Sequence, residues 1–335
     1  MSAEPGAGAA GAVAVTDPAP LFEARDLVKH FRSRGSTVRA VDGVSFTIPR
    51  GRTVGLVGES GSGKSTVARL ALRLLEPTSG ELSFDGVDLR GAGRGELRAL
   101  RRRMQIVFQD PFGSLNPRMR VLDAVGEPLS VHGLARGRAR RDRVVELLER
   151  VGLSAKDLTK FAHQFSGGQA QRIGIARALA TDPDLIVCDE AVSALDVSVQ
   201  AQVLNLLKRL QAELGLSYLF IAHDLNVVRY MSDEVCVMYL GRIVERGDGD
   251  ALFADPRHPY SEMLVSAVPE FDPANTGRAR PAPRGEAPSP SRPPSGCRFH
   301  PRCPRAFDRC STDEPVVHPV APGRTAACHL LEVDR

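Results

Sequence analysis

The 335-residue sequence lacks any run of about eighteen apolar residues, the length that a helix needs to cross a bilayer, so no membrane-spanning segment is expected. Its net charge of +4 is modest, so bulk charge gives no indication of a nucleic-acid partner. Residues 1–19 lack a basic stretch and consist mostly of Ala, Gly and Pro, with an acidic Glu4. This composition predicts a disordered tail and not a signal peptide.

Aromatic residues are missing from the most basic stretch, residues 90–103, which ends in Arg101, Arg102 and Arg103. Proteins that bind single-stranded nucleic acid usually combine basic and aromatic side chains. We therefore interpret this stretch as a solvated helix face, with nucleic-acid binding as the alternative.

A glycine-rich loop at residues 58–66 is the most informative feature that is present. It follows a short apolar run, Thr53–Val57, and precedes a helical pattern over Val67–Leu75. Strand, loop and helix together place backbone N–H groups and a helix N-terminus at phosphate oxygens, so the segment is a P-loop. Its lysine can reach the β- and γ-phosphates, and the serine that follows can bind Mg²⁺. The predicted nucleotide contacts are Gly58, Ser60, Gly61, Ser62, Gly63, Lys64, Ser65 and Thr66.

Two adjacent acids follow a second apolar run, Leu185–Asp189. A carboxylate at the end of a buried parallel strand lies beside the P-loop, where Asp189 can bind Mg²⁺. Glu190 points elsewhere and can orient or activate the attacking water, whereas a solvated loop is the alternative for both acids.

A second phosphate-binding pattern is Ser166-Gly167-Gly168-Gln169, which opens a helical run over Ile173–Ala180. A hydroxyl, free backbone N–H groups and the helix dipole converge there, although an ordinary helix N-cap gives the same pattern. One nucleotide needs only one such surface. The second surface therefore suggests a head-to-tail dimer, in which it contacts a nucleotide held by the partner's P-loop.

The order of these motifs resembles that of the ATPases of ABC transporters. The resemblance rests on the P-loop, Gln109 after Met104–Phe108, Ser166–Gln169, Asp189–Glu190, Ser193–Asp196, and His223 after Tyr218–Ala222. It implies an α/β P-loop NTPase with a RecA-like core, an antiparallel β lobe and an inserted helical lobe.

The resemblance also implies residue roles. Gln109 would contact Mg²⁺ and the attacking water and sense the membrane subunits, and Ser193–Asp196 would cross the dimer interface. His223 would contact the γ-phosphate, beside the catalytic Glu190 and Lys64. Phe31 matches the position of an aromatic residue that stacks on adenine, with a packed strand residue as the alternative.

Three further segments resemble the oligopeptide and dipeptide importers: Val107–Met119, Asp255–Pro269 and the cysteine-bearing tail. This resemblance implies an ATP hydrolase that powers peptide import at the cytoplasmic face of the membrane. Its partners would be a second ATPase subunit, more typically a paralogue, two permeases and an extracytoplasmic peptide-binding protein, with no nucleic acid. Ala170 and Ala191 depart from the subfamily pattern, and neither removes a ligand.

The expected organisation is a tail at 1–19, an ATPase domain at 20–268 with a helical lobe at about 110–168, and a Pro-rich linker at 269–296. Residues 297–335 would form a small Cys-rich C-terminal appendage. Four cysteines, Cys297, Cys303, Cys310 and Cys328, crowd into it, and such clusters in cytosolic proteins more often bind metal than form disulfides.

Spacing alone does not identify the metal. The family resemblance implies a [4Fe–4S] cluster, with zinc and free thiols as alternatives. Cys188 and Cys236 lie in strand-like runs and are expected to be core residues.

Three other functions stay open at this stage. One is an ABC ATPase that does not transport, although such proteins usually carry two ATPase units or a long coiled coil. Another is an importer of other cargo, such as nickel chelates or modified peptides. The third is a redox-responsive module built on the tail.

Overall fold

The computed structural model describes residues 19–33, 35–267 and 285–333. Residue 19 is the one residue of the predicted tail among them, and residues 285–296 are the described part of the predicted linker. The remainder of both predictions lies outside the described residues. Within these ranges, no helix has the length and apolar character required to cross a bilayer.

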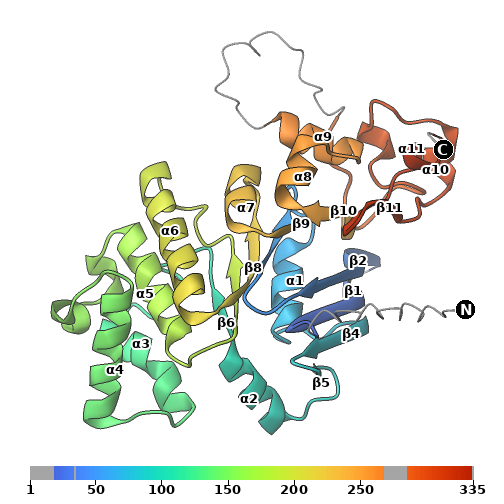
Figure 1. Ribbon diagram of the computed structural model, residues 1–335. Coiled ribbons are helices and arrows are strands. Elements are labelled where there is room, and N and C mark those ends of the chain that lie inside the picture. The colour runs from blue at the N-terminus through green and yellow to red at the C-terminus, as the bar shows by residue number, and fades with distance from the viewer. Residues whose placement is uncertain (1–18, 34, 268–284, 334–335) are drawn as a thin grey trace, which may run out of the picture.

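A mixed eight-stranded sheet, which we call the core sheet, runs through the centre of the molecule (Figure 1). Its strand order is β11-β12-β10-β9-β3-β8-β7-β6. Neighbours from β9 to β6 are parallel, and β10, β12 and β11 continue the sheet in antiparallel pairing. The strands are β3 (Thr53–Val57), β6 (Met104–Val107), β7 (Leu185–Asp189), β8 (Ser217–Ala222), β9 (Glu234–Tyr239), β10 (Arg242–Asp248), β11 (His318–Ala321) and β12 (Arg324–Ala326).

The central strands are buried on both faces, as their unbroken apolar runs predict. In β7, Leu185 and Val187 pack into one hydrophobic core, and Ile186 and Cys188 pack into the other. Cys188 and Cys236 are both fully buried, as expected. Because the sheet is covered on both faces, its functional groups are confined to the carboxyl ends of the strands.

A second, antiparallel sheet packs on one of these cores and forms the predicted β lobe. It consists of β2 (Ser36–Ile48), β1 (Phe22–Ser33), β4 (Ser79–Phe84) and β5 (Val87–Asp88), in that order. Phe22 and Phe46 pack against each other there with ring centroids 5.6 Å apart. Both side chains share a core with Val54 and Leu56 of β3, so this lobe directly supports the strand before the P-loop.

Helices cover the core sheet and build a separate lobe on one side of it (Figure 1). The helical lobe contains α3 (Val121–Val131), α4 (Gly137–Arg150) and two 3₁₀ turns, Ala155–Thr159 and Ala162–Gln164. The other helices are α1 (Lys64–Ala71), α2 (Arg94–Arg103), α5 (Gly167–Leu179), α6 (Val197–Leu214), α7 (Leu225–Met231), α8 (Gly249–Ala254), α9 (Pro259–Ser266), α10 (Asp308–Thr312) and α11 (Leu330–Val333).

The C-terminal segment, residues 285–333, joins the core sheet instead of standing apart from it. Strand β12 pairs with β10, with Glu245 opposite Ala326. A buried ion pair joins the same two strands, with Arg324 Nη2 at 2.8 Å from Glu245 Oε1. In Figure 1 this segment lies at the opposite end of the molecule from the helical lobe.

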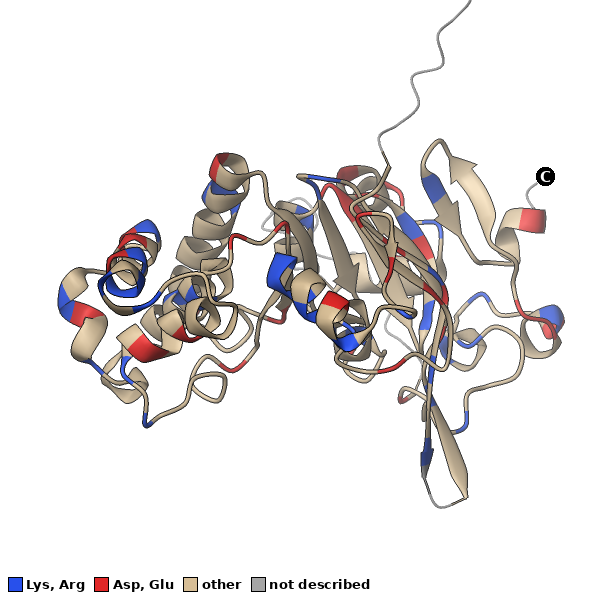
Figure 2. Ribbon diagram, turned by 90° about the horizontal axis from the view of Figure 1, so that it is seen from below, with Lys and Arg blue, Asp and Glu red and all other residues tan. Residues whose placement is uncertain are grey.

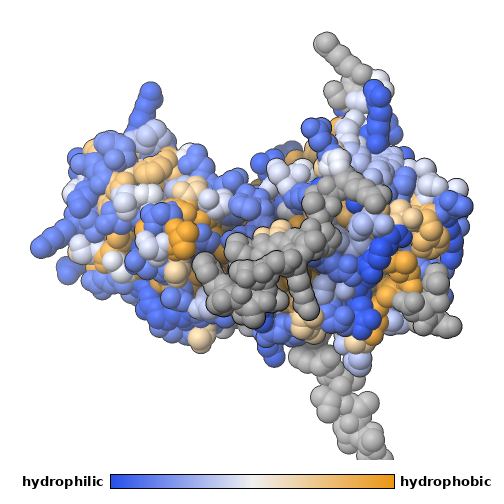
Figure 3. Space-filling view, turned by 90° about the horizontal axis from the view of Figure 1, so that it is seen from above, coloured by the Kyte–Doolittle hydropathy of each residue, from blue (hydrophilic) through white to orange (hydrophobic). Residues whose placement is uncertain are grey.

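Charged residues of both signs are interspersed over the described surface (Figure 2). Exposed apolar residues on the face shown in Figure 3 form small separate patches among polar ones. In the basic helix α2, Arg101 donates to the carbonyl of Leu72 at 3.1 Å, and Arg103 pairs with Asp85 and Asp184. The predicted solvated face therefore includes the exposed Arg102, whereas Arg101 and Arg103 are half-buried and contact neighbouring elements.

Candidate functional site

The P-loop joins β3 to α1 through glycine conformations that other residues rarely adopt. Gly63, the N-cap of α1, has a φ of 107°, and a Cβ there would lie 2.0 Å from the carbonyl oxygen of Ala40. A Cβ at Gly58 would lie 2.1 Å from the carbonyl oxygen of Met238. These close approaches explain why glycine is required at both positions. The loop leads directly into the N-terminus of α1, where backbone N–H groups are free to bind an anion.

Lys64 is buried within this loop, with 4% of its surface exposed. Its Nζ donates to the carbonyl oxygens of Gly58 at 2.7 Å and Glu59 at 3.0 Å, and lies 3.5 Å from Ser62 Oγ. Burial lowers the pKa of the ammonium, and the nearby Glu190 and Asp189 oppose that shift. The cation is therefore held where a bound phosphate would meet it.

Ser65 and Asp189 meet at the carboxyl end of β7. Ser65 Oγ donates to Asp189 Oδ1 at 2.9 Å. Burial raises the pKa of Asp189, and the hydrogen bond from Ser65 opposes that rise. A hydroxyl and a carboxylate this close together form the oxygen ligand set that Mg²⁺ prefers, so these residues fit the predicted metal.

Glu190, Gln109 and His223 converge from the ends of three neighbouring strands. Gln109 Nε2 donates to Glu190 Oε2 at 3.0 Å and to Ser193 Oγ at 3.3 Å. His223 Nδ1 lies 3.8 Å from the same Glu190 oxygen. Gln109 follows β6 and His223 follows β8, on either side of β7. This arrangement suits a carboxylate that orients water beside a phosphate.

A cavity of about 320 Å³ opens over the P-loop. Besides most of the loop, its lining includes Gln109 and Glu190 from the strand ends. The lining residues are Val38, Ala40, Ser60, Gly61, Gly63, Lys64, Ser65, Thr66, Gln109, Glu190 and Pro290. Groups predicted to bind phosphate, to bind metal and to orient water therefore share one cavity, which we call the nucleotide cavity.

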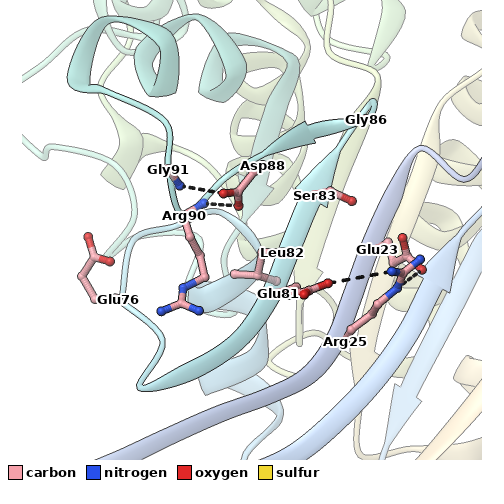
Figure 4. A pocket seen from close by; sticks show the side chains of 10 residues that line it. All are labelled: Glu23, Arg25, Glu76, Glu81, Leu82, Ser83, Gly86, Asp88, Arg90 and Gly91. Atoms are coloured by element: carbon pink, nitrogen blue, oxygen red, sulfur yellow. Dashed lines mark hydrogen bonds and ion pairs between the residues drawn. The ribbon is translucent and has the colours of Figure 1, made fainter.

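A larger cavity, of about 680 Å³, lies on the antiparallel sheet (Figure 4). Its charged groups pair with one another: Arg25 contacts Glu23 at 2.7 Å and Glu81 at 3.8 Å. Asp88 accepts from the backbone N–H groups of Arg90 and Gly91. We place the nucleotide in the smaller cavity, because the P-loop lines that one.

Several predicted contacts lie outside the lining of the nucleotide cavity. Gly58, Ser62 and Asp189 bond to the lining residues Lys64 or Ser65 instead. Phe31 is paired with Val38, which does line it, and the Phe31 ring lies 5.2 Å from the ammonium of Lys29. Adenine stacking on Phe31 remains a prediction.

The Ser166-Gly167-Gly168-Gln169 segment is also absent from that lining. Gln169 N donates to Ser166 Oγ at 3.3 Å, and Ser166 N donates to Gln169 Oε1 at 3.1 Å. This reciprocal capping box starts α5, so the N-cap alternative describes the local structure. The predicted second phosphate surface remains a prediction.

The four C-terminal cysteines lie in one segment with mostly buried thiols. Burial raises the pKa of Cys297 and of Cys328 to about 11, and it raises that of Cys303. In the described residues, no three His, Cys, Asp or Glu side chains form a group that could hold a metal ion. Among these described residues the four cysteines therefore do not form a metal site, and the structure does not support the [4Fe–4S] prediction.

Sequence reasoning missed three residues near the P-loop. Pro290 lines the nucleotide cavity. Tyr260 accepts a hydrogen bond from the backbone N–H of Glu59 at 2.8 Å, and Arg302 pairs with the Glu59 carboxylate. Tyr260 and Arg302 lie in segments that resemble the peptide importers, but nothing in those segments indicates contact with a loop more than two hundred positions away.

Two family profiles match the chain. One is described as ABC transporter and covers residues 41–193. The other is described as the oligopeptide/dipeptide transporter C-terminal region and covers residues 244–310.

Known proteins resemble the chain over nearly its whole length. A putative peptide import ATP-binding protein of Brucella ovis is 52% identical over 309 residues, or 92% of this chain and 97% of that protein. A putative oligopeptide transport ATP-binding protein of Bacillus subtilis, YkfD, is 50% identical over 93% of this chain and 95% of its own length.

Among solved structures, a dimeric post-hydrolysis state of the ATP-binding cassette MJ0796 bound to ADP and Pi is similar, with a TM-score of 0.62 and 31% identity. It covers 68% of this chain and 98% of that one. The cbiO1 protein of Clostridium perfringens, part of the transporter complex cbiONQ, also has a TM-score of 0.62, with 29% identity over 70% of this chain and 91% of its own.

Proposed function

The chain belongs to the family of ATP-binding subunits of ABC-type peptide transporters, and from that membership we propose that it hydrolyses ATP to power the import of dipeptides or oligopeptides. One observation carries the proposal for this chain. P-loop residues, Gln109 and Glu190 line a single cavity, and Asp189 and His223 lie directly behind it, Asp189 bonded to Ser65 and His223 3.8 Å from Glu190.

The residue roles follow from that geometry. Ser65, Asp189 and Gln109 would hold Mg²⁺, which supplies positive charge to the phosphate oxygens. Glu190 orients the attacking water and accepts its proton, Gln109 holds the carboxylate in place, and His223 contacts the γ-phosphate. Lys64 exchanges its carbonyl partners for phosphate oxygens and stabilises the charge of the transferring phosphoryl group.

The partners belong to the same proposal. A second ATPase subunit, more typically a paralogue, would close on this chain, and its Ser166–Gln169 counterpart would complete the cavity. Two permease subunits would form the membrane path, and an extracytoplasmic protein would deliver the peptide. The chain would work at the cytoplasmic face of that membrane.

A metal at Cys297, Cys303, Cys310 and Cys328, [4Fe–4S] before zinc, remains a proposal that rests on four thiols in one segment. Metal binding replaces the thiol protons, and the raised pKa of three of these thiols opposes that loss. Anaerobic purification with iron, sulfide and zinc analysis tests it. About four irons and four sulfides per chain would support the cluster, and four free thiols by titration would reject any metal.

The hydrolysis part is tested by Glu190→Gln. ATP binding should be retained while turnover falls by at least ~10²-fold, the low end for a positioned base. Glu213→Gln is the matched control, because that glutamate pairs with Arg209 on the exposed side of α6. Turnover close to that of the natural chain in Glu190→Gln would remove Glu190 from the role of base.

The transport part is tested by recovering the tagged chain from its native membranes in mild detergent. Two multi-span permeases, a second ATPase and a peptide-class binding protein should accompany it. Permeases found with a binding protein for another ligand class would replace the peptide as cargo. Recovery with ribosomes or DNA would overturn transport and leave the ATPase chemistry standing.

A further inference from the structure

The C-terminal segment reaches into the P-loop through Arg302. This residue ends a short 3₁₀ turn, His300–Arg302, directly before Cys303. Its Nη1 lies 2.7 Å from Glu59 Oε2, and its Nη2 lies 3.0 Å from Glu59 Oε1. Glu59 follows the first glycine of the loop, so a two-pronged ion pair joins the loop to the far end of the chain.

Aromatic side chains hold both partners of this ion pair. The Arg302 guanidinium lies 5.9 Å from the ring centroid of Tyr239 and 6.0 Å from that of Phe299. The Tyr260 hydroxyl accepts from the backbone N–H of Glu59 at 2.8 Å. The Arg302 side chain is 6% exposed and that of Glu59 is 31% exposed, so the guanidinium is fixed and the carboxylate faces partly toward solvent.

Glu59 is in turn connected to the lysine that meets the phosphates. Its carbonyl oxygen accepts from Lys64 Nζ at 3.0 Å. Its carboxylate belongs to the same loop that binds the anionic nucleotide, and an unpaired carboxylate there would repel the phosphates. Arg302 therefore affects phosphate binding in two ways, by fixing the loop and by neutralising this charge.

A second arginine keeps the C-terminal segment in place. Arg298 pairs with Asp42 of β2 and donates to the carbonyl oxygen of Leu240. The side chains of Arg298 and Asp42 are 8% and 12% exposed. Upstream, Pro290 lines the nucleotide cavity and accepts from the backbone N–H of Arg39 at 3.1 Å. The segment is thus fastened to β2 at two points, Arg39 and Asp42.

We propose that Arg302 is a positioning residue for the P-loop, through which the C-terminal segment sets the affinity of the cavity for nucleotide phosphates. This inference rests on the proposed function, because it needs a nucleotide at the P-loop. A loop that is already fixed loses less conformational freedom when the nucleotide binds. When Arg302 neutralises Glu59, the positive charge of Lys64 attracts the phosphates at full strength.

Binding of MgADP to the full chain, measured by calorimetry, tests the proposal with three variants. Arg302→Met keeps an unbranched side chain against the rings but removes the charge, and the Kd should rise about 10-fold. The double variant, Arg302→Met with Glu59→Gln, also lacks the unpaired carboxylate, and its Kd should return to within about 3-fold of that of the natural chain. Arg305→Met is the control, because it breaks only an exposed ion pair with Glu262 in the same segment.

Recovery in the double variant separates charge from structure. If Arg302 only held the fold together, the double variant would bind as weakly as Arg302→Met and both variants would unfold at lower urea concentrations than the natural chain, and this outcome would overturn the proposal. An unchanged Kd in Arg302→Met would overturn it as well. A natural chain that binds no MgADP would instead overturn the proposed function.

A variant on the loop side covers the case in which Arg302→Met does not fold. Glu59→Asp keeps the negative charge but withdraws it from Arg302 by one methylene group, while the C-terminal segment stays intact. The Kd for MgADP should again rise several-fold, and more at low salt than at high salt. An unchanged Kd in this variant rejects the role of the ion pair.

Discussion

Glu190 has a left-handed backbone, with a φ of 50°, directly after the buried strand β7. Its N–H donates to the carbonyl oxygen of Ile221 in β8 at 2.9 Å, which secures this uncommon conformation. The turn separates two adjacent carboxylates. Asp189 faces Ser65, and Glu190 faces Gln109 and His223. The residues predicted to bind metal and to activate water therefore face different groups at one strand end.

Gln109→Ala should lower ATP turnover by about 10-fold or more, because it removes the amide that orients Glu190. The Kd for ATP measured without Mg²⁺ should change little, since the P-loop is untouched. Gln105→Ala is the control on the preceding strand, where the side chain bonds only to the carbonyl oxygen of Arg101. Equal turnover in the two variants would show that Gln109 does not position Glu190.

At the scale of elements, α5 begins at Ser166 and passes close to α6. A Cβ at Gly168 would lie 2.2 Å from Val199 Cγ1 of α6, whereas a Cβ at Gly174 would meet no atom within 4 Å. Both glycines are helical, and only the first contacts the neighbouring helix. The start of α5 is therefore set by its packing on α6.

Gly168→Ala should destabilise the protein by about 1–3 kcal/mol, the usual cost of overpacking, and it should lower ATP turnover because the helix start moves. Gly174→Ala should instead stabilise it by about 0.5–1 kcal/mol, because alanine restricts the unfolded chain. Urea denaturation of both variants is the measurement. A stabilising Gly168→Ala would mean that α5 can shift freely against α6.

Element boundaries could be predicted where burial alone sets them. The apolar runs predicted at Thr53–Val57 and Leu185–Asp189 are strands β3 and β7 with the same bounds. The helix predicted at Val67–Leu75 instead spans Lys64–Ala71. It starts earlier because the P-loop itself forms its first turn, and it ends earlier because Arg73 takes a left-handed conformation, with a φ of 53°.

For the whole molecule, the sequence predicts the residues of the nucleotide site but not what supports them. Motif order is sufficient to predict that Lys64, Gln109 and Glu190 lie together, because each follows a recognisable strand, and all three line one cavity. The pairing of β12 with β10 and the reach of Arg302 to Glu59 depend on contacts between distant segments. Spacing along the chain does not indicate such contacts, and the sequence therefore predicts the C-terminal segment as a separate appendage.

Asp42 joins the antiparallel sheet to the C-terminal segment and should contribute to stability in a pH-dependent way. Its carboxylate contacts His30, Arg298 and Arg242. Burial alone would raise the pKa of Asp42, but the hydrogen bonds from His30 and Arg298 and the charges of both arginines hold it below its ordinary value. A carboxyl with a lowered pKa in the folded state stabilises the fold above its unfolded pKa, and this contribution is lost as the pH falls through the folded pKa.

Asp42→Asn should lower the free energy of unfolding at pH 7 by about 3 kcal/mol, the low end for a buried charge left without its partner, here Arg298. The difference from the natural chain should persist down to about pH 5 and narrow below about pH 4, where the unfolded carboxyl binds a proton. Arg309→Gln is the control, because it breaks only exposed ion pairs with Asp313 and Glu332 and should change stability by less than about 1 kcal/mol. The free energies of unfolding are measured by urea denaturation across this pH range. If the difference between Asp42→Asn and the natural chain stays constant down to pH 3.5, then packing, and not the charge of Asp42, holds the C-terminal segment against the antiparallel sheet.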